Sequence, residues 1–249
     1  MFRLIVPKLK AAGLHMICTV IVAAISAFLV FRVWYPGRFS EMLDVGAIYG
    51  LLLLVEVGMG PLLSFVIYNT TKKRAELFRD YCVVGVLQLA ALFYGMHSVF
   101  EGRPVFLVFV KDRIEVVTAN ELEDSSFTEV EIADFKRKAL FGPKLACYER
   151  PTDEEQLEEI MFYTMAGLDV HLLPKHFKHC KQGDLLANAG NASLLLSNRT
   201  TAQTEMELLR GRVFYWLPIL DHKRLAWTAV FETESWDSLE LYDIDSFLP

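Results

Sequence analysis

Three long apolar segments in the first hundred residues limit what this chain can fold into more than any other feature. Residues 11–31 and 81–100 contain no formally charged side chain, and residues 45–71 contain one, Glu56. About 20 apolar residues in a helix, rising 1.5 Å each, match the roughly 30 Å hydrocarbon core of a bilayer. The sequence therefore predicts a membrane protein with three transmembrane helices.

The first apolar segment also fits a second interpretation, a cleaved signal peptide. Arg3, Lys8 and Lys10 resemble a basic n-region, and residues 24–26 (Ala-Ile-Ser) form a passable cleavage site. The apolar run continues past that site and is longer than a typical signal h-region. We therefore favour a membrane helix.

Charge divides the chain into two regions of opposite sign. Residues 1–100 carry 9 basic and 5 acidic side chains, net +4, whereas residues 101–249 carry 16 basic and 26 acidic ones, net −10. We expect a three-helix transmembrane region over 1–100 and a separate domain over 101–249. The acidic charge of that domain argues against nucleic acid as a partner.

Basic residues that flank the apolar segments predict the orientation in the membrane. Seven of them lie before the first segment or between the second and third, whereas only two, Arg32 and Arg38, lie between the first and second. Positive residues concentrate on the cytoplasmic side of membrane proteins. We therefore expect a cytoplasmic N-terminus and, after three crossings through membrane lipid, a domain on the far side, which in a bacterium is the periplasm.

The second region has the pattern of a mixed α+β domain, long enough to bury a core. Two β-rich runs flank a polar turn at 111–113, which predicts a hairpin over 104–110 and 114–118. Further strands are expected over 144–148 and 238–244, and a second hairpin is expected over 213–219 and 225–233 around a polar turn at 221–224. One helix is expected over 127–139, and a second begins at a cap, Thr152 or Asp153, and ends at about residue 165. Residues 172–187 are expected to form a helix and a loop.

The four cysteines separate into two pairs by location. Cys18 and Cys82 lie in the apolar segments, where such side chains act as small apolar groups. Cys147 and Cys180 lie in the exported region, where an oxidising compartment lets a disulfide persist. Because the compartment is oxidising and the other two cysteines lie in the membrane segments, we expect a disulfide between Cys147 and Cys180.

The densest set of potential metal ligands is a short run with His171, His176, His179 and Cys180. Pro174 interrupts any helix that would align these side chains, and neighbouring lysines would repel a cation. We therefore favour a docking helix tied down by its cysteine, and we expect no metal site.

Motifs that carry catalysis are absent from the sequence. It contains no Gly-rich phosphate loop, no G-x-S-x-G elbow, no H-E-x-x-H and no C-x-x-C. An acidic run over 153–159 has helical spacing and fits a solvated helix face better than a calcium site. We expect neither an enzyme nor a cofactor.

Polar and small residues inside the apolar segments are the best candidates for a functional site. Polar side chains are costly in a bilayer and are therefore usually functional or paired internally, for example by a hydrogen bond between Glu56 and Gln88. Glycines four residues apart let another helix approach closely, and a proline permits a kink. The candidate contacts with a partner helix are Gly46, Gly50, Glu56, Gly60, Pro61 and Gln88.

Four blocks of sequence, in order along the chain, point to a known family. They cover residues 33–39, 56–63, 87–95 and 103–113, and together they resemble the TfpX/TfpZ family of type IV pilin accessory proteins. Outside the apolar segments the resemblance is carried by Tyr35, Pro36, Arg103, Pro104, Asp112 and Arg113. The family more often has Asp at position 56 and an acidic residue at position 111, so the resemblance does not extend to a particular pilin.

The resemblance implies a protein of the bacterial inner membrane with three crossings and a periplasmic domain, needed for production or assembly of a pilin. The implied partners are the major type IV pilin and the pilus assembly machinery. A pilin that awaits assembly has an apolar membrane helix and a periplasmic head, and this chain has surfaces of both kinds. The alternative is a membrane-anchored periplasmic ligand-binding sensor or a transporter accessory subunit. Such a protein should have either a cytoplasmic output module or more than three membrane helices, and the sequence shows neither.

Overall fold

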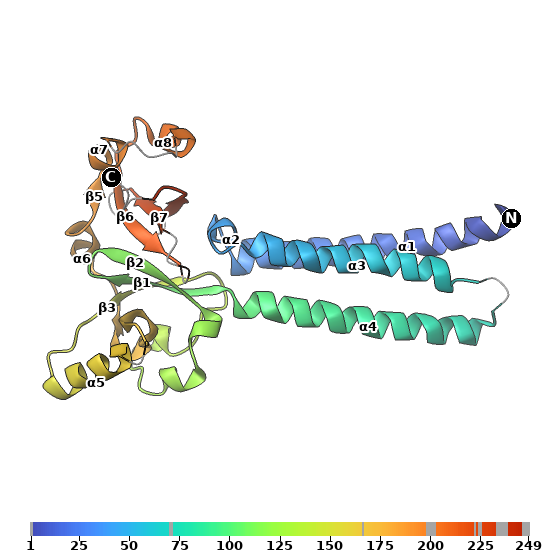
Figure 1. Cartoon of the computed structure of the whole chain (residues 1–249), viewed down its shortest axis with the longest axis horizontal. Coiled ribbons are helices and arrows are strands. Elements are labelled where there is room, and N and C mark those ends of the chain that lie inside the picture. Colours follow the sequence, from blue (N-terminus) through green and yellow to red (C-terminus); the bar gives the residue numbers. More distant parts are fainter. Residues whose placement is uncertain are drawn as a thin grey trace. The chain divides into compact units, whose positions relative to one another are not determined.

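The computed structural model of the protein contains two compact units. It describes residues 2–69, 72–165, 167–197, 203–221, 223, 226–232 and 239–245. The first unit comprises Met1–Val33 and Asp44–Glu101, and the second comprises Trp34–Leu43 and Gly102–Pro249. Figure 1 shows the long helices of the first unit and the sheet of the second.

The first unit consists of three long helices, as predicted. Helix α1 (Phe2–Phe28) continues as a π-helical turn, η1 (Leu29–Trp34), and is followed by α3 (Val45–Ile67) and α4 (Arg74–Glu101). Over the described residues, three stretches are long and apolar enough to span a membrane: Ile5–Trp34, Val45–Ile67 and Arg74–Glu101. Many of their large apolar side chains are exposed, which suits a lipid environment. The chain is a membrane protein.

Side chains of α3 connect it to both neighbouring helices. The Tyr49 hydroxyl donates to the Ala23 carbonyl of α1 at 2.9 Å and shares a second hydrogen bond with Ser26 at 2.7 Å. On the other side, Leu52 fills the space above Gly95 of α4, where an added Cβ would lie only 2.5 Å from a Leu52 methyl group. Small residues and interhelical hydrogen bonds therefore hold the three helices together.

The second unit is built on a mixed sheet, which in the described residues has eight strands in the order β4-β3-β1-β2-β6-β7-β8, with β5 paired to β6. The pairs β1–β3 and β2–β6 are parallel, and the others are antiparallel. The strands are β1 (Pro104–Val110), β2 (Arg113–Thr118), β3 (Lys144–Tyr148), β4 (Phe177–Lys178), β5 (Gly190–Asn191), β6 (Tyr215–Leu220), β7 (Ala226–Phe231) and β8 (Glu240–Tyr242). The predicted hairpins and the strand over 144–148 are confirmed.

Short helices and turns cover this sheet. They are α5 (Glu154–Met165), α6 (Gln182–Leu186), α7 (Ala192–Ser197), α8 (Gln203–Leu209) and the 3₁₀ turns η2 (Ala119–Glu121), η3 (Asp124–Phe127), η4 (Ala133–Phe135), η5 (Val170–Leu172) and η6 (Pro174–His176). Helix α5 was predicted, and the Asp153 carboxylate accepts from the Gln156 amide at 3.3 Å as its cap. The fold class, three N-terminal membrane helices followed by a mixed α+β domain, is confirmed.

Two helix predictions were wrong. Residues 127–139 form an irregular segment with the turn η4, and residues 171–180 form 3₁₀ turns and the short strand β4 instead of a docking helix. The helix that was expected together with a loop in 172–187 is confined to α6. The buried Phe135 and Phe177 from these segments contact the buried Phe106 of β1, with ring centroids 6.0 and 5.5 Å apart. Apolar side chains spaced three to four residues apart can reach a core from successive 3₁₀ turns as well as from an α-helix.

Candidate functional site

A cluster of polar side chains joins the three membrane helices around Gly60. The His15 ring of α1 shares a 2.5 Å hydrogen bond with the Ser64 hydroxyl of α3. A Cβ added at Gly60 would collide with the Gln88 amide of α4 and lie 3.0 Å from the His15 ring. His15 and Ser64 were missed by the sequence reasoning, although an ionisable residue inside an apolar span was an available signal.

A cavity of about 190 Å³ lies beside this cluster, lined among others by His15, Thr19, Ser26, Glu56 and Gln88. Glu56 is only 7% exposed, and its Oε1 has no hydrogen-bond partner among the described residues. The predicted hydrogen bond between Glu56 and Gln88 is not formed, although both line the same space. A cavity of this size has room for water, which commonly satisfies such groups.

The six candidate contact residues in the membrane therefore separate into two sets. Gly46 and Gly50 are exposed, and a Cβ added at either one would meet no atom within 4 Å. Glu56, Gly60 and Pro61 of α3 are buried within the helix unit, and Gln88 of α4 lies against Gly60. We call the exposed surface of α3 around Gly46 and Gly50 the open face, because no side chain of this unit covers these two glycines.

The connection between the first two spans is part of the sheet domain. It contains the short helix α2 (Phe39–Met42) and buries Tyr35, Met42 and Leu43. Burial raises the pKa of the Tyr35 hydroxyl, and the nearby positive charge of Arg103 acts in the opposite direction. Tyr35, which follows the first span, and Arg103, which follows the third, both carry the family resemblance and therefore meet in the sheet domain.

Arg38 fixes this connection to the far end of the chain. Its guanidinium donates to both carboxylate oxygens of Glu205 in α8, at 2.7 and 3.2 Å, and to the Leu241 carbonyl of β8 at 3.1 Å. It also lies 5.0 Å from the Trp227 ring centroid in β7. Planar bidentate pairing of this kind is specific to arginine. The sequence reasoning missed this role, because the partners lie more than 160 residues away.

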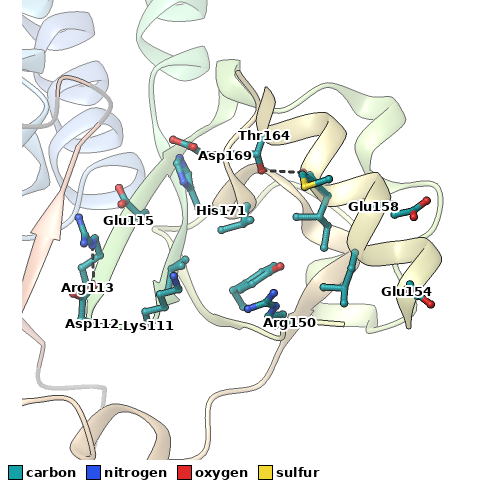
Figure 2. A pocket seen from close by; sticks show the side chains of 16 residues that line it. Lys111, Asp112, Arg113, Glu115, Arg150, Glu154, Glu158, Thr164, Asp169 and His171 are labelled. Atoms are coloured by element: carbon teal, nitrogen blue, oxygen red, sulfur yellow. Dashed lines mark hydrogen bonds and ion pairs between the residues drawn. The ribbon is translucent and has the colours of Figure 1, made fainter. Parts of the chain in front are cut away.

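A groove of about 620 Å³ lies between the β1–β2 hairpin and α5 in the sheet domain. Figure 2 shows Lys111, Asp112 and Arg113 on the hairpin side and Glu154 and Glu158 on the helix side. The apolar part of its lining includes Leu157, Ile160 and Met161. Its rim thus mixes charges of both signs around an apolar wall, which suits a protein surface as a ligand.

Hydrogen bonds and ion pairs hold some of the polar groups that line the groove. Its aliphatic hydroxyl, on Thr164, donates to the Ile160 carbonyl of its own helix at 2.8 Å. Asp112 and Arg113, two residues of the family resemblance, pair with each other at 2.9 Å at the hairpin turn. This arrangement stabilises the turn and presents one charge pair at the mouth of the groove.

The histidines considered as metal ligands do not gather into a site. Across the part of the chain that the structure describes, no three His, Cys, Asp or Glu side chains form a metal-binding group. Burial lowers the pKa of the His176 imidazole, and the adjacent positive charge of Lys175 lowers it further. Cys180 is instead joined to Cys147 by a disulfide, with Cα atoms 5.0 Å apart, which ties the segment after β4 to β3.

Comparison with known proteins gives a consistent set of relatives. The family described as Fimbrial assembly protein FimB matches residues 3–43. The fimbrial assembly protein of serogroup I of Dichelobacter nodosus is 27% identical over 89% of this chain and 93% of its own length. The serogroup E1 protein of the same organism is 22% identical over 96% of this chain and 95% of its own length.

A shorter relative shows the highest identity among these matches. The fimbrial assembly protein of Dichelobacter nodosus serogroups C1 and C2 is 33% identical over 113 residues, which cover 45% of this chain and 86% of the relative. No solved structure matches the chain. The FimB match covers the first span and the connection that Arg38 fixes to the sheet domain. From the match to the serogroup C1 and C2 protein, of which this chain covers 86%, the chain belongs to the family of fimbrial assembly proteins.

Proposed function

We propose that this protein is an inner-membrane accessory protein of type IV fimbrial biogenesis that binds the major fimbrial subunit, the pilin, before its assembly. The family supplies the general role in fimbrial biogenesis, since relatives that match nearly the whole chain are named fimbrial assembly proteins. The resemblance of four sequence blocks to the TfpX/TfpZ proteins supports the narrower role as a pilin accessory protein.

The open face of α3 is the observation that carries this proposal. Gly46 and Gly50 leave the helix backbone uncovered, with no atom within 4 Å of an added Cβ at either glycine. In a bilayer, small residues four apart allow two helix backbones to approach and gain van der Waals contact. An apolar membrane helix is the chemical class of partner that fits such a surface, and a fimbrial subunit awaiting assembly supplies one.

Surfaces of the sheet domain offer a second contact for the globular part of the subunit. Helix α5, which lines one side of the groove, exposes Met161, Phe162 and Met165, which are 62%, 71% and 83% exposed. Methionine-rich apolar surface suits adaptable protein contacts. We assign no cofactor, no nucleic acid and no catalytic step to this surface; the pilus assembly machinery is a further proposed partner.

The proposed topology places the N-terminus in the cytoplasm and the sheet domain in the periplasm. It rests on seven basic residues around the cytoplasmic ends of the spans against three, Arg32, Arg38 and Arg103, at the other ends. A reporter enzyme that is active only in the periplasm should be active when fused after Ser125 and inactive when fused after Lys73. Activity at Lys73 and none at Ser125 would contradict the topology.

A clean deletion of the gene tests the proposed function. We expect a strain without the protein to lose most of its surface fimbriae, with unchanged transcription of the major subunit gene, because the defect lies in handling the subunit. Fimbriae are counted by electron microscopy, and subunit transcript and protein are measured in the same cells. Expression of the intact gene in trans should restore fimbriae; normal fimbriae in the deletion strain would overturn the proposal.

A further inference from the structure

We propose that the loop at residues 136–143 is a lipid anchor, which inserts Leu140 and Phe141 into the leaflet adjacent to the sheet domain. Both side chains are large, apolar and exposed, Leu140 at 50% and Phe141 at 83%. Lys136 and Arg137, just before them, are also exposed, and neither makes an ion pair with another described residue. Apolar tips beside basic residues match the acyl chains and phosphates of a phospholipid surface.

The loop is attached within the sheet domain to the residues at which the chain leaves the membrane. The guanidinium of Arg103 is buried and donates its Nε hydrogen to the Ala139 carbonyl at 3.1 Å. Arg103 follows the end of α4 at Glu101 by two residues. At the other end of the loop, a Cβ added at Gly142 would lie 3.0 Å from Pro36, which follows the end of η1 at Trp34 by two residues.

These two attachments keep Leu140 and Phe141 near the bilayer surface. Two residues of extended chain span at most about 7 Å. The chain connection alone therefore keeps the backbone of Arg103 and that of Pro36 within this distance of the end of a membrane span. Leu140 and Phe141 lie between these two attachments in the chain, which brings a lipid surface within their reach.

The backbone of the loop is held firmly while its tip is left outside the core. Phe135 and Ala139 are buried at 1% and 5% exposure, and Gly142 has a left-handed φ of +66° that favours glycine. The exposure of Leu140 and Phe141 is therefore imposed by the fold.

Charge distinguishes this loop from the exposed apolar surface of α5. Phe162 on α5 is 71% exposed, but its helix also carries Glu154, Glu155, Glu158 and Glu159. Anionic phospholipids repel such an acidic helix and attract the basic loop. Phe162 therefore provides a matched control of the same residue type.

Spin labelling of the full-length protein in lipid nanodiscs tests the proposal. In a background with Cys18→Ala and Cys82→Ala, a nitroxide is attached at Phe141→Cys or at Phe162→Cys, and collisions with oxygen and with a water-soluble nickel chelate are measured. We expect the label at position 141 to collide mainly with oxygen, as in acyl chains, and the label at 162 to collide mainly with the nickel chelate. Equal, water-like behaviour at both positions would overturn the proposal.

A charge-reversal variant tests the headgroup contact. Lys136→Glu with Arg137→Glu should make the label at 141 more accessible to the nickel chelate in nanodiscs that contain anionic lipid. With Lys136 and Arg137 intact, inorganic phosphate at millimolar concentration should leave the accessibility of the label at position 141 unchanged, because acyl chains hold the loop. Release of the label by phosphate would overturn the proposal in favour of a simple anion site.

Discussion

Replacing Cys147 and Cys180 together by alanine is expected to lower the free energy of unfolding of the sheet domain by about 3–4 kcal/mol, the value that chain entropy gives for a closed loop of this length. The disulfide joins residues 33 positions apart. Besides the disulfide, the segment 177–180 is held by the two-residue strand β4, which offers few ladder hydrogen bonds to β3, and by the buried Phe177 side chain. Loss of the disulfide therefore has two effects. It gives the unfolded chain more conformational freedom, and it weakens the attachment of β4 to β3 at this edge of the folded sheet.

Unfolding of the full-length protein in detergent, followed by intrinsic tryptophan fluorescence, measures this effect. Trp216 and Trp227 report on the sheet domain, since both are buried in it. The matched control is Cys18→Ala with Cys82→Ala, which removes two free, exposed thiols in the membrane helices and should leave the transition unchanged. An unchanged transition in the variant without the disulfide would contradict the prediction.

Much of the fold could be predicted because its elements are marked by local sequence. The run of residues 104–110 is almost entirely Val, Phe and Leu, which suits a strand buried on both faces, and the polar residues 111–113 mark the turn to β2. Helix α5 has its cap and its acidic first turn in order. The three spans follow from length and apolar composition alone.

The parts that could not be predicted depend on contacts between distant residues. Arg38 was counted only for its charge, yet it joins Glu205 and Leu241. Two apolar residues of the connection, Tyr35 and Met42, are buried in the sheet domain. The connection has more apolar side chains than a solvated loop needs, and this composition could have indicated its burial. In the membrane, spacing alone could not tell that Gly60 is covered by Gln88 while Gly50 is open.

The second large effect is expected from filling the open face of α3. Gly50→Ile adds a branched side chain where no atom of the protein lies within 4 Å, so the three-helix unit should fold normally. The same side chain prevents a second helix from approaching the backbone at this point. Gly13→Ile on α1 is the matched control, because Gly13 is also exposed with open space above it.

Co-purification of the major fimbrial subunit with the full-length protein from mild detergent tests the central claim directly. Wild-type protein, Gly50→Ile and Gly13→Ile are expressed at equal levels in the deletion strain, and the subunit recovered per molecule of bait is measured by quantitative mass spectrometry. We expect wild type and Gly13→Ile to recover the subunit equally and Gly50→Ile to lose most of it. Recovery of the subunit by Gly50→Ile at the wild-type level, or by none of the three proteins, would contradict the account.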